Sequence, residues 1–324
     1  MNNIVASSID KCILILYNHN MRIFLFVING LGVGSLPDYS KYDSEYECTA
    51  EQIKCIQKAT ILKKMGLFKC CLQEDNTPAL GHFLRGRMLT TKTNFECGFK
   101  EILGNVVFDD DNSIAENLID TLKKHNVDVV CFSSNSDCTE ADKICESDRE
   151  IAYLLSEFKS EKDSVLIAEF NDFAKFALSG NKDKMEDAIL FVNDFLASVI
   201  GELKYDDVLI ASGNFGVNPS KIGITREYNP IFVCSKLLGT SQSLKTIQGN
   251  NCIAMSVVEL LKIYPNSNSF VGSKLRQKID NYGILLKNEI IASRFEKHTD
   301  FKIGEEKQKT VKTSKKRFVK DKKN

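Results

Sequence analysis

A continuous apolar run near the start of the chain constrains the fold more than any other segment. It extends from Arg22 to Ile28, is rich in β-forming residues, and is followed by the glycine-rich turn Asn29 to Gly34. A strand without alternating polar residues is buried on both faces, as in a parallel sheet covered by helices. The run therefore predicts a central strand of an α/β domain.

Further along the chain, predicted strands alternate with predicted helices. The expected strands are 127–132, 165–170, 208–211 and 230–234, and the expected helices are 61–67, 113–122, 184–203 and 252–264. Ser113 and Glu116 have the spacing of a capping box at the start of the second of these helices. The alternation predicts a mostly parallel sheet with helices on both faces.

The two ends of the chain differ from its body. Residues 1–20 read as an N-terminal extension, and Met21 could be a natural start. Ten Lys or Arg residues stand against three acids over 302–324, so this segment carries about +7 in a chain of net charge zero. We expect one α/β domain over 21–300 and a disordered basic tail over 301–324, which could contact nucleic acid weakly.

The eleven cysteines are scattered, with no C-x-x-C pair and no spacing typical of zinc ligands. An odd number of cysteines without a secretion signal predicts free thiols in a reducing compartment. The apolar run Cys12 to Tyr17 is too short to span a bilayer. We therefore expect a cytoplasmic protein with no membrane partner.

The turn after the first predicted strand has the spacing G-x-G-x-G, in Gly30, Gly32 and Gly34. A dinucleotide site would have G-x-G-x-x-G and an acidic residue about twenty positions later. The pattern favours a tight turn at the end of a sheet, with nucleotide binding as the alternative.

A longer stretch, Phe26 to Asp38, resembles the opening of the phosphopentomutases, which are members of the alkaline-phosphatase superfamily. In that family the first strand ends in a metal-binding Asp-Ser, followed by Gly-Ile-Gly and Leu-Pro-Asp. Here Asn29 and Gly30 stand at the Asp-Ser, and Leu36-Pro37-Asp38 is retained. Four further segments resemble the family in the same order: Leu62–Leu67, Asp206–Pro219, Thr225–Pro230 and Asn268–Phe270. The resemblance spans 21–280 and implies an alkaline-phosphatase-like core.

The family moves a phosphate between C1 and C5 of ribose or deoxyribose through a phosphorylated threonine. Two divalent ions of the Mn²⁺ class stabilise the reacting oxygens, held by carboxylates and imidazoles. By the resemblance, the ligand positions are Asn29, Asn214, Phe215, Ile224, Gly180 and either Ala174 or Lys175, and the nucleophile position is Phe95. Phe and Ile cannot bind a metal, and none of the four histidines falls at a ligand position. We expect no catalytic residue, no metal ligand and no cofactor, with two Mn²⁺ ions only if the family site were retained.

Two further features bear on substrate binding. The family inserts a cap domain after its nucleophile, and here that insertion is vestigial, near residues 104–112. Without a cap, enclosure of a substrate and exclusion of water are in doubt. Arg226 is the retained polar residue that could contact a substrate anion, and an ion pair with Glu227 or another acid is its alternative role.

Three functions remain open from the sequence. The first is a pseudoenzyme kept for binding or scaffolding, with an active homologue or another protein as its partner. The second is an active phosphopentomutase or phosphatase with a rearranged site, built on acids such as Asp38, Asp43 or Asp109–Asp111. The third is a metal-independent binder of pentose phosphate or another anion around Arg226.

Overall fold

The computed structural model describes residues 20–41, 47–73, 75–106, 117–238, 243–244, 246–263, 275 and 277. Apart from Gln277, they belong to one compact unit that ends at Leu275. The strands are β1 (Arg22–Asn29), β2 (His82–Arg87), β3 (Asp128–Ser133), β4 (Lys143–Ile144), β5 (Ser164–Phe170), β6 (Val208–Asn214), β7 (Gly216–Asn218), β8 (Gly223–Thr225), β9 (Asn229–Cys234) and β10 (Ile247–Gln248). The helices are η1 (Tyr39–Lys41), α2 (Thr49–Gln52), η2 (Lys54–Lys58), α3 (Thr60–Met65), α4 (Leu67–Cys70), α5 (Phe95–Ile102), α6 (Leu118–Lys124), α7 (Asp148–Glu157), α8 (Asp172–Leu178), α9 (Lys182–Glu202) and α10 (Cys252–Leu260).

Eight of these strands form one mixed sheet, in the order β10-β2-β9-β6-β1-β5-β3-β4. The strand β1 pairs in parallel with β5 and β6, while β9 is antiparallel to both of its neighbours. The antiparallel direction of β9 follows from its connection to β6, because the β7–β8 hairpin joins the two strands and no crossover helix lies between them. The predicted fold class, a mostly parallel sheet in an α/β domain, is confirmed.

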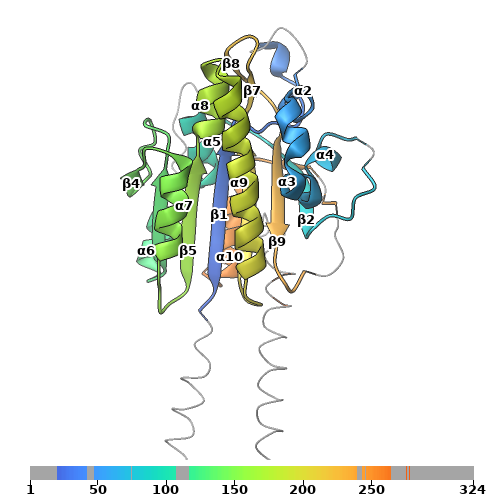
Figure 1. Cartoon of the computed structure of the whole chain (residues 1–324). Coiled ribbons are helices and arrows are strands. Elements are labelled where there is room, and N and C mark those ends of the chain that lie inside the picture. The colour runs from blue at the N-terminus through green and yellow to red at the C-terminus, as the bar shows by residue number, and fades with distance from the viewer. Residues whose placement is uncertain are drawn as a thin grey trace, which may run out of the picture. The chain divides into compact units, whose positions relative to one another are not determined.

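Helices cover both faces of the sheet. The long helix α9 lies along one face and packs against α3, α7 and α8, and Figure 1 shows it in front of the sheet, between β1 and β9. On the opposite face α10 packs against α5 and α6. None of the helices in the described residues has the length and apolarity needed to cross a membrane.

The strand β1 carries the core on both of its faces. Phe24, Phe26 and Ile28 belong to the apolar cluster that includes α9, and the residues between them are equally buried. The ring of Phe26 stacks on that of Phe195 in α9, with the ring centroids 5.6 Å apart. The prediction that this strand is buried on both sides is confirmed.

Other predicted elements differ from the structure mainly at their ends. The four strands predicted after β1 correspond to β3, β5, β6 and β9, whereas β2, β4, β7, β8 and β10 were not predicted. The predicted helix 184–203 is α9, which Asn181 caps by accepting from the Lys184 N–H. The predicted helix 252–264 stops earlier, at Leu260. The predicted capping box of Ser113 and Glu116 lies outside the described residues, and the helix described there has Asn117 as its N-cap.

The predicted domain limits fall largely on segments that the structure does not describe. The N-terminal extension 1–20, apart from Asn20, and the basic tail 301–324 both lie outside the described residues. The vestigial cap near 104–112 is described only to Val106. Only residues 103–117 connect α5 to α6, and a segment of this length is far below the size of a domain.

We expect a side chain at Gly213 to destabilise the fold, because β6 there lies directly against the turn that follows β1. A Cβ at Gly213 would lie 2.0 Å from the Leu31 carbonyl oxygen, whereas a Cβ at Gly201 in α9 would meet nothing within 4 Å. Gly213→Ala should lower the free energy of unfolding by about 1–3 kcal/mol. Gly201→Ala, the matched control, should raise it by up to about 1 kcal/mol. Urea unfolding measures both, and equal effects would contradict the close approach.

Candidate functional site

Polar side chains gather where the parallel strands of the sheet end. Asn29 at the end of β1 lies directly opposite Asn214 at the end of β6. On the other side of β1, Glu169 of β5 lies opposite Val27, and Ser133 of β3 lies opposite Glu169. All four polar residues are fully buried. The carboxyl ends of parallel strands are where open α/β sheets bind their ligands, so this edge is the candidate functional site.

The two asparagines bind each other. The Asn214 Nδ2 group donates to Asn29 Oδ1 at 2.8 Å and to the Phe95 carbonyl oxygen at 2.8 Å. The Asn29 Nδ2 group donates in turn to Glu169 Oε1 and to Asn171 Oδ1, both at 2.9 Å. The amide groups are therefore oriented by each other and by a carboxyl group of their own chain.

Glu169 is the acceptor at the centre of this network. Its Oε2 accepts from the Ser133 hydroxyl at 2.6 Å, and its Oε1 accepts from Asn135 Nδ2 at 3.3 Å as well as from Asn29. Burial raises the pKa of Glu169, and the hydrogen bonds from Ser133, Asn29 and Asn135 oppose that shift. Each of these three partners is a neutral donor, so the network satisfies the carboxyl group without using a cation.

The residues at this edge do not fit a pair of Mn²⁺-class ions. Such ions take carboxylate, imidazole or other oxygen ligands. The Asn29 oxygen accepts from Asn214 and its nitrogen points to Glu169, while Phe215 is a buried hydrocarbon side chain. Ala174 lies beside the glycine turn, because a Cβ on Gly30 would be 3.1 Å from the Ala174 Cβ. Of the two positions matched to the ligand Asp, Ala174 and Lys175, the first thus lies beside the turn and carries only a methyl group.

One oxygen of the network has no hydrogen-bond partner among the described residues. It is Asn214 Oδ1, which is buried and faces Gly98, where a Cβ would lie 1.9 Å from it. A single neutral oxygen cannot supply the several ligands that a divalent cation requires. This atom therefore does not change the conclusion on metal fit.

The position matched to the family's nucleophile lies at the same place. Phe95 is the first residue of α5, and Asn94 caps that helix by accepting from the Cys97 N–H at 2.8 Å. The Phe95 carbonyl oxygen contacts Asn214, so the structure brings together the three matched positions 29, 95 and 214. Ile224 lies instead on β8, opposite Val217.

The glycine-rich turn wraps around a carboxyl group of its own chain. Glu227 Oε2 accepts from the Gly34 N–H at 3.0 Å and the Thr49 N–H at 2.9 Å, and Oε1 accepts from the Thr49 and Thr225 hydroxyls. A Cβ on Gly32 would lie 2.4 Å from Glu227 Oε2. The turn needs glycine at 32 because the Glu227 carboxyl group occupies that space. Of the two sequence interpretations, the structure therefore favours the tight turn over a nucleotide site.

Arg226 is buried, with only 2% of its surface exposed. Its guanidinium forms an ion pair with Asp38 at 3.0 Å and donates to the Thr90 carbonyl oxygen at 2.8 Å. The predicted alternative role as an ion-pair partner thus involves Asp38 of the Leu-Pro-Asp segment, while Glu227 binds the glycine turn. In this arrangement Arg226 joins three separate segments of the chain.

A second buried carboxyl group lies next to the first network. Asp148, the first residue of α7, accepts at Oδ1 from the Ser134 hydroxyl at 2.5 Å and the Asn171 N–H at 3.0 Å. Its own N–H donates to Asp172 Oδ2 at 2.9 Å. Burial, followed by the nearby Asp172 carboxyl group, raises the pKa of Asp148 to about 7.

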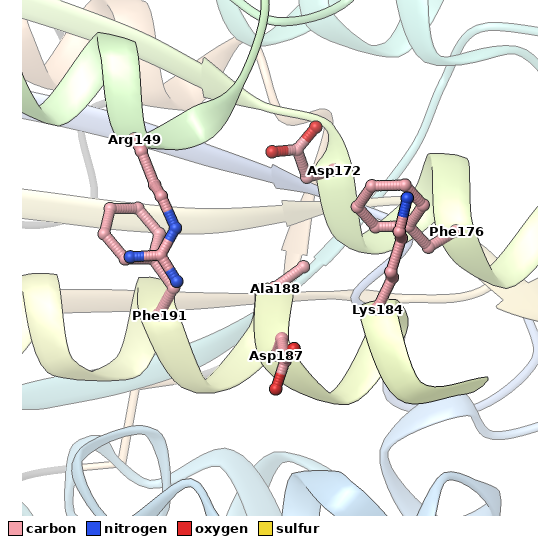
Figure 2. A pocket seen from close by; sticks show the side chains of 7 residues that line it. All are labelled: Arg149, Asp172, Phe176, Lys184, Asp187, Ala188 and Phe191. Carbon is pink, nitrogen blue, oxygen red and sulfur yellow. The ribbon is translucent and has the colours of Figure 1, made fainter. Parts of the chain in front are cut away.

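Asp172 also lines a cavity of about 150 Å³ between α7, α8 and α9 (Figure 2). The other lining residues are Arg149, Phe176, Lys184, Asp187, Ala188 and Phe191. The guanidinium carbon of Arg149 lies 4.6 Å from the Phe191 ring centroid, and the Lys184 ammonium lies 5.4 Å from that of Phe176. Both cations are exposed, on opposite sides of the cavity in Figure 2, and the carboxyl groups of Asp172 and Asp187 line the same cavity.

The central residues of these networks were not predicted from the sequence. Glu169, Asn135 and Asp148 lie far from one another along the chain and match no motif. One signal was available, because Glu169 interrupts an otherwise apolar run in a predicted buried strand. An acid in such a position must find hydrogen-bond donors or be neutral.

Solved structures similar to this chain include several enzymes of phosphate chemistry. The alkaline phosphatase of the Antarctic bacterium TAB5 is 10% identical, with a TM-score of 0.48, and the match covers 75% of this chain and 99% of that one. The soluble domain of lipooligosaccharide phosphoethanolamine transferase A from Neisseria meningitidis is 15% identical, with a TM-score of 0.43 and coverages of 79% and 93%. The lipoteichoic acid synthase LtaP from Listeria monocytogenes is 10% identical, with a TM-score of 0.48 and coverages of 80% and 76%.

A TAB5 alkaline phosphatase mutant solved with Mg bound in its M3 site has a TM-score of 0.46 and is 10% identical. No known protein family and no curated protein sequence matches the chain. At TM-scores below 0.5, these likenesses carry no inference about activity or metal binding in this protein. That inference rests on the residues at the edge of the sheet.

We expect Asp148 to make stability depend on pH. In the folded chain its carboxyl group holds a proton up to about pH 7, whereas in the unfolded chain it is ionised above about pH 4. The folded state therefore binds more protons in this window, and stability falls as pH rises, by up to about 1.4 kcal/mol per pH unit. Asp148→Asn should flatten the dependence of the urea midpoint between pH 5 and 7. Asp120→Asn, at an exposed position, should leave it unchanged, and equal slopes in all three proteins would contradict this assignment.

A carboxylate at position 29 should be poorly tolerated. Asn29→Asp removes the N–H donor to Glu169 and sets two carboxyl groups side by side in a buried site. We expect a loss of about 3 kcal/mol or more at pH 7, which shrinks as the pH falls, and no recovery on addition of Mn²⁺. Asn181→Asp, at the exposed N-cap of α9, is the matched control and should be nearly neutral. Thermal unfolding with and without Mn²⁺ measures all of these effects.

Proposed function

We propose that this protein is a catalytically inactive relative of the phosphopentomutases that acts by binding or scaffolding. The observation that carries the proposal is the hydrogen-bonded pair Asn29 and Asn214 at the ends of β1 and β6. The resemblance places both residues at positions that hold metal in the family. Here their amides are fully buried and bind each other and Glu169.

The chemistry of the family explains why this pair argues against catalysis. Transfer of a dianionic phosphoryl group needs positive charge at the reacting oxygens, which two metal ions supply in the family. At this edge the side chains are amides, hydroxyls, one buried carboxyl group and the phenylalanines 95 and 215. The donors at this edge are neutral and already bind the Glu169 carboxyl group, so they bring no positive charge to a phosphate group.

An active enzyme with a rearranged site is the less supported alternative. Of the acids considered for it, Asp38 forms an ion pair with the buried Arg226. Asp43 and Asp109–Asp111 lie outside the described residues. Asp38, the only acid of this set within the described residues, therefore stabilises the fold through its ion pair with Arg226.

The metal-independent anion binder is supported at a different place from the one the sequence suggested. Arg226 is buried against Asp38, whereas Arg149 and Lys184 are exposed around the cavity of Figure 2. These two side chains could contact a phosphate group, with the phenylalanine rings behind them. Pentose phosphate, an active homologue and another protein remain the proposed partners.

We also propose a cytoplasmic location. The ten cysteines in the described part of the chain are free thiols, which suits a reducing compartment.

The test is a phosphopentomutase assay on the purified protein with ribose 1-phosphate and Mn²⁺, together with a Mn²⁺ binding titration. We expect no formation of ribose 5-phosphate and no saturable Mn²⁺ binding, because among the described residues no group of three or more metal-ligating side chains converges at this edge. The titration is repeated on Cys48→Ser/Cys71→Ser, because these two thiols lie next to the Glu51 carboxyl group and could bind a metal ion away from this edge. Mn²⁺-dependent formation of ribose 5-phosphate would contradict the proposal and show that metal ligands lie elsewhere.

A second measurement separates the anion binder from a pure scaffold. The melting temperature is recorded with ribose 5-phosphate and without metal, in the wild type and in Arg149→Ala/Lys184→Ala. A rise that the double variant loses would assign pentose phosphate binding to the cavity of Figure 2. A rise that it keeps, or none at all, would exclude that cavity as a pentose phosphate site.

A further inference from the structure

Two thiols and a carboxyl group meet away from the sheet edge. One ligand atom from each of Cys48, Glu51 and Cys71 lies within 4.8 Å of the other two. Cys48 is the N-cap residue of α2, Glu51 follows within that helix, and Cys71 directly follows α4. None of them belongs to the networks around Glu169 or Asp148. The three residues form a cluster that needs its own explanation.

The backbone holds both thiols in place. The residue after Cys48 is Thr49, whose N–H and hydroxyl both donate to the buried Glu227. Cys71 is the C-cap of α4 and donates its N–H to the Leu67 and Phe68 carbonyl oxygens. The cluster is therefore held at the end of two short helices, α2 and α4, that pack against each other.

The spacing of Cys48 and Glu51 places both side chains on one side of α2. Residues three apart in a helical turn are neighbours on its surface. Cys48 is buried, Cys71 is half-buried and Glu51 is exposed, so the cluster can be reached from solvent on the Glu51 side. A site with two inner thiols and an outer carboxyl group is open to an ion that enters from water.

The ligand types favour a thiophilic divalent cation. Thiolates select zinc and similar ions over magnesium, calcium and manganese, and zinc also accepts a carboxylate oxygen. A Cys48–Cys71 disulfide would use both thiols but would give the nearby carboxyl group no role.

We propose that Cys48, Glu51 and Cys71 bind one Zn²⁺ ion, with water or an external ligand at the fourth position. Binding forms two S–Zn bonds and one O–Zn bond, and the two thiol protons pass to solvent. The ion would join α2 to α4, close to the Glu227 carboxyl group around which the glycine turn folds. This site is independent of the Mn²⁺ positions of the phosphopentomutases and of the proposed function.

Co²⁺ is the probe for the test, because it replaces zinc and reports thiolate ligands by its charge-transfer absorption. The full chain, reduced and freed of metal, is titrated with Co²⁺ and then with Zn²⁺. We expect one equivalent of Co²⁺ to bind with a sulfur-to-cobalt band, proton release, and displacement by Zn²⁺. The Cys252→Ser variant, which changes a thiol outside the cluster, should behave as the wild type.

Variants of the cluster provide the contrast. Cys48→Ser and Cys71→Ser should each lose the sulfur-to-cobalt band of the stoichiometric site. Glu51→Gln changes an exposed side chain, so its fold should persist, and it should weaken Zn²⁺ binding at least about tenfold, since even an outer partner of a metal ligand is worth that much. Circular dichroism confirms that each variant is folded before it is titrated.

Three results would overturn the proposal. The first is no stoichiometric Co²⁺ binding by the reduced wild type. The second is an equal affinity for Zn²⁺ in the wild type and Glu51→Gln, with the sulfur-to-cobalt band kept in both serine variants. The third is a Cys48–Cys71 disulfide that mass spectrometry finds to form in the presence of equimolar Zn²⁺. The phosphopentomutase assay uses a different metal and readout, so its outcome leaves these results unchanged.

Discussion

The buried Glu169 carboxyl group is the constraint on which the candidate functional edge of this sheet depends. It lies on a strand next to β1, is fully buried, and accepts from Ser133, Asn29 and Asn135. A buried carboxyl group without partners would cost several kcal/mol, so each neighbouring strand end must supply a donor. The Asn29 amide meets this need, and that fixes its orientation toward Asn214. The same hydrogen bonds that stabilise the fold thereby occupy the atoms a metal would need.

The buried Glu227 carboxyl group likewise needs hydrogen-bond donors, and the glycine turn supplies one of them. The N–H of Gly34 and the groups of Thr49 converge on a carboxyl group, as the N–H groups of a phosphate-binding loop converge on an anion. Because the anion belongs to the chain, the turn is closed, and a Cβ at Gly32 or Gly216 would collide with it. A loop that resembles a ligand site in sequence is here an internal connection, and the same carboxyl group binds Thr49, the residue after Cys48.

Prediction from the sequence succeeded where a pattern is local. The apolar run of β1, the periodicity of α9 and the order of strands and helices placed most of the sheet. It missed β2, whose Arg85 and Gly86 break the apolar pattern, and it did not foresee that β9 runs antiparallel. For the site, motif matching identified positions 29, 95 and 214, which the structure brings together. It did not identify Glu169, Asp148 or the cluster of Cys48, Glu51 and Cys71, because their members are separated along the chain and join through packing.

The sequence by itself determined which atoms can stand at each strand end. Asn29, Asn214 and Phe215 exclude an anionic metal ligand at their positions whatever the fold, because amides are neutral and a phenyl ring has no lone pair to donate. Only the tertiary structure decided how those atoms are used. Hydrogen-bond partners depend on distances of about 3 Å between segments far apart in sequence. Register between β1, β5 and β6 brings Asn29 next to Glu169 and Asn214. Packing of the turn after β1 against residues 226 and 227 brings Arg226 to Asp38 and the Gly34 N–H to Glu227.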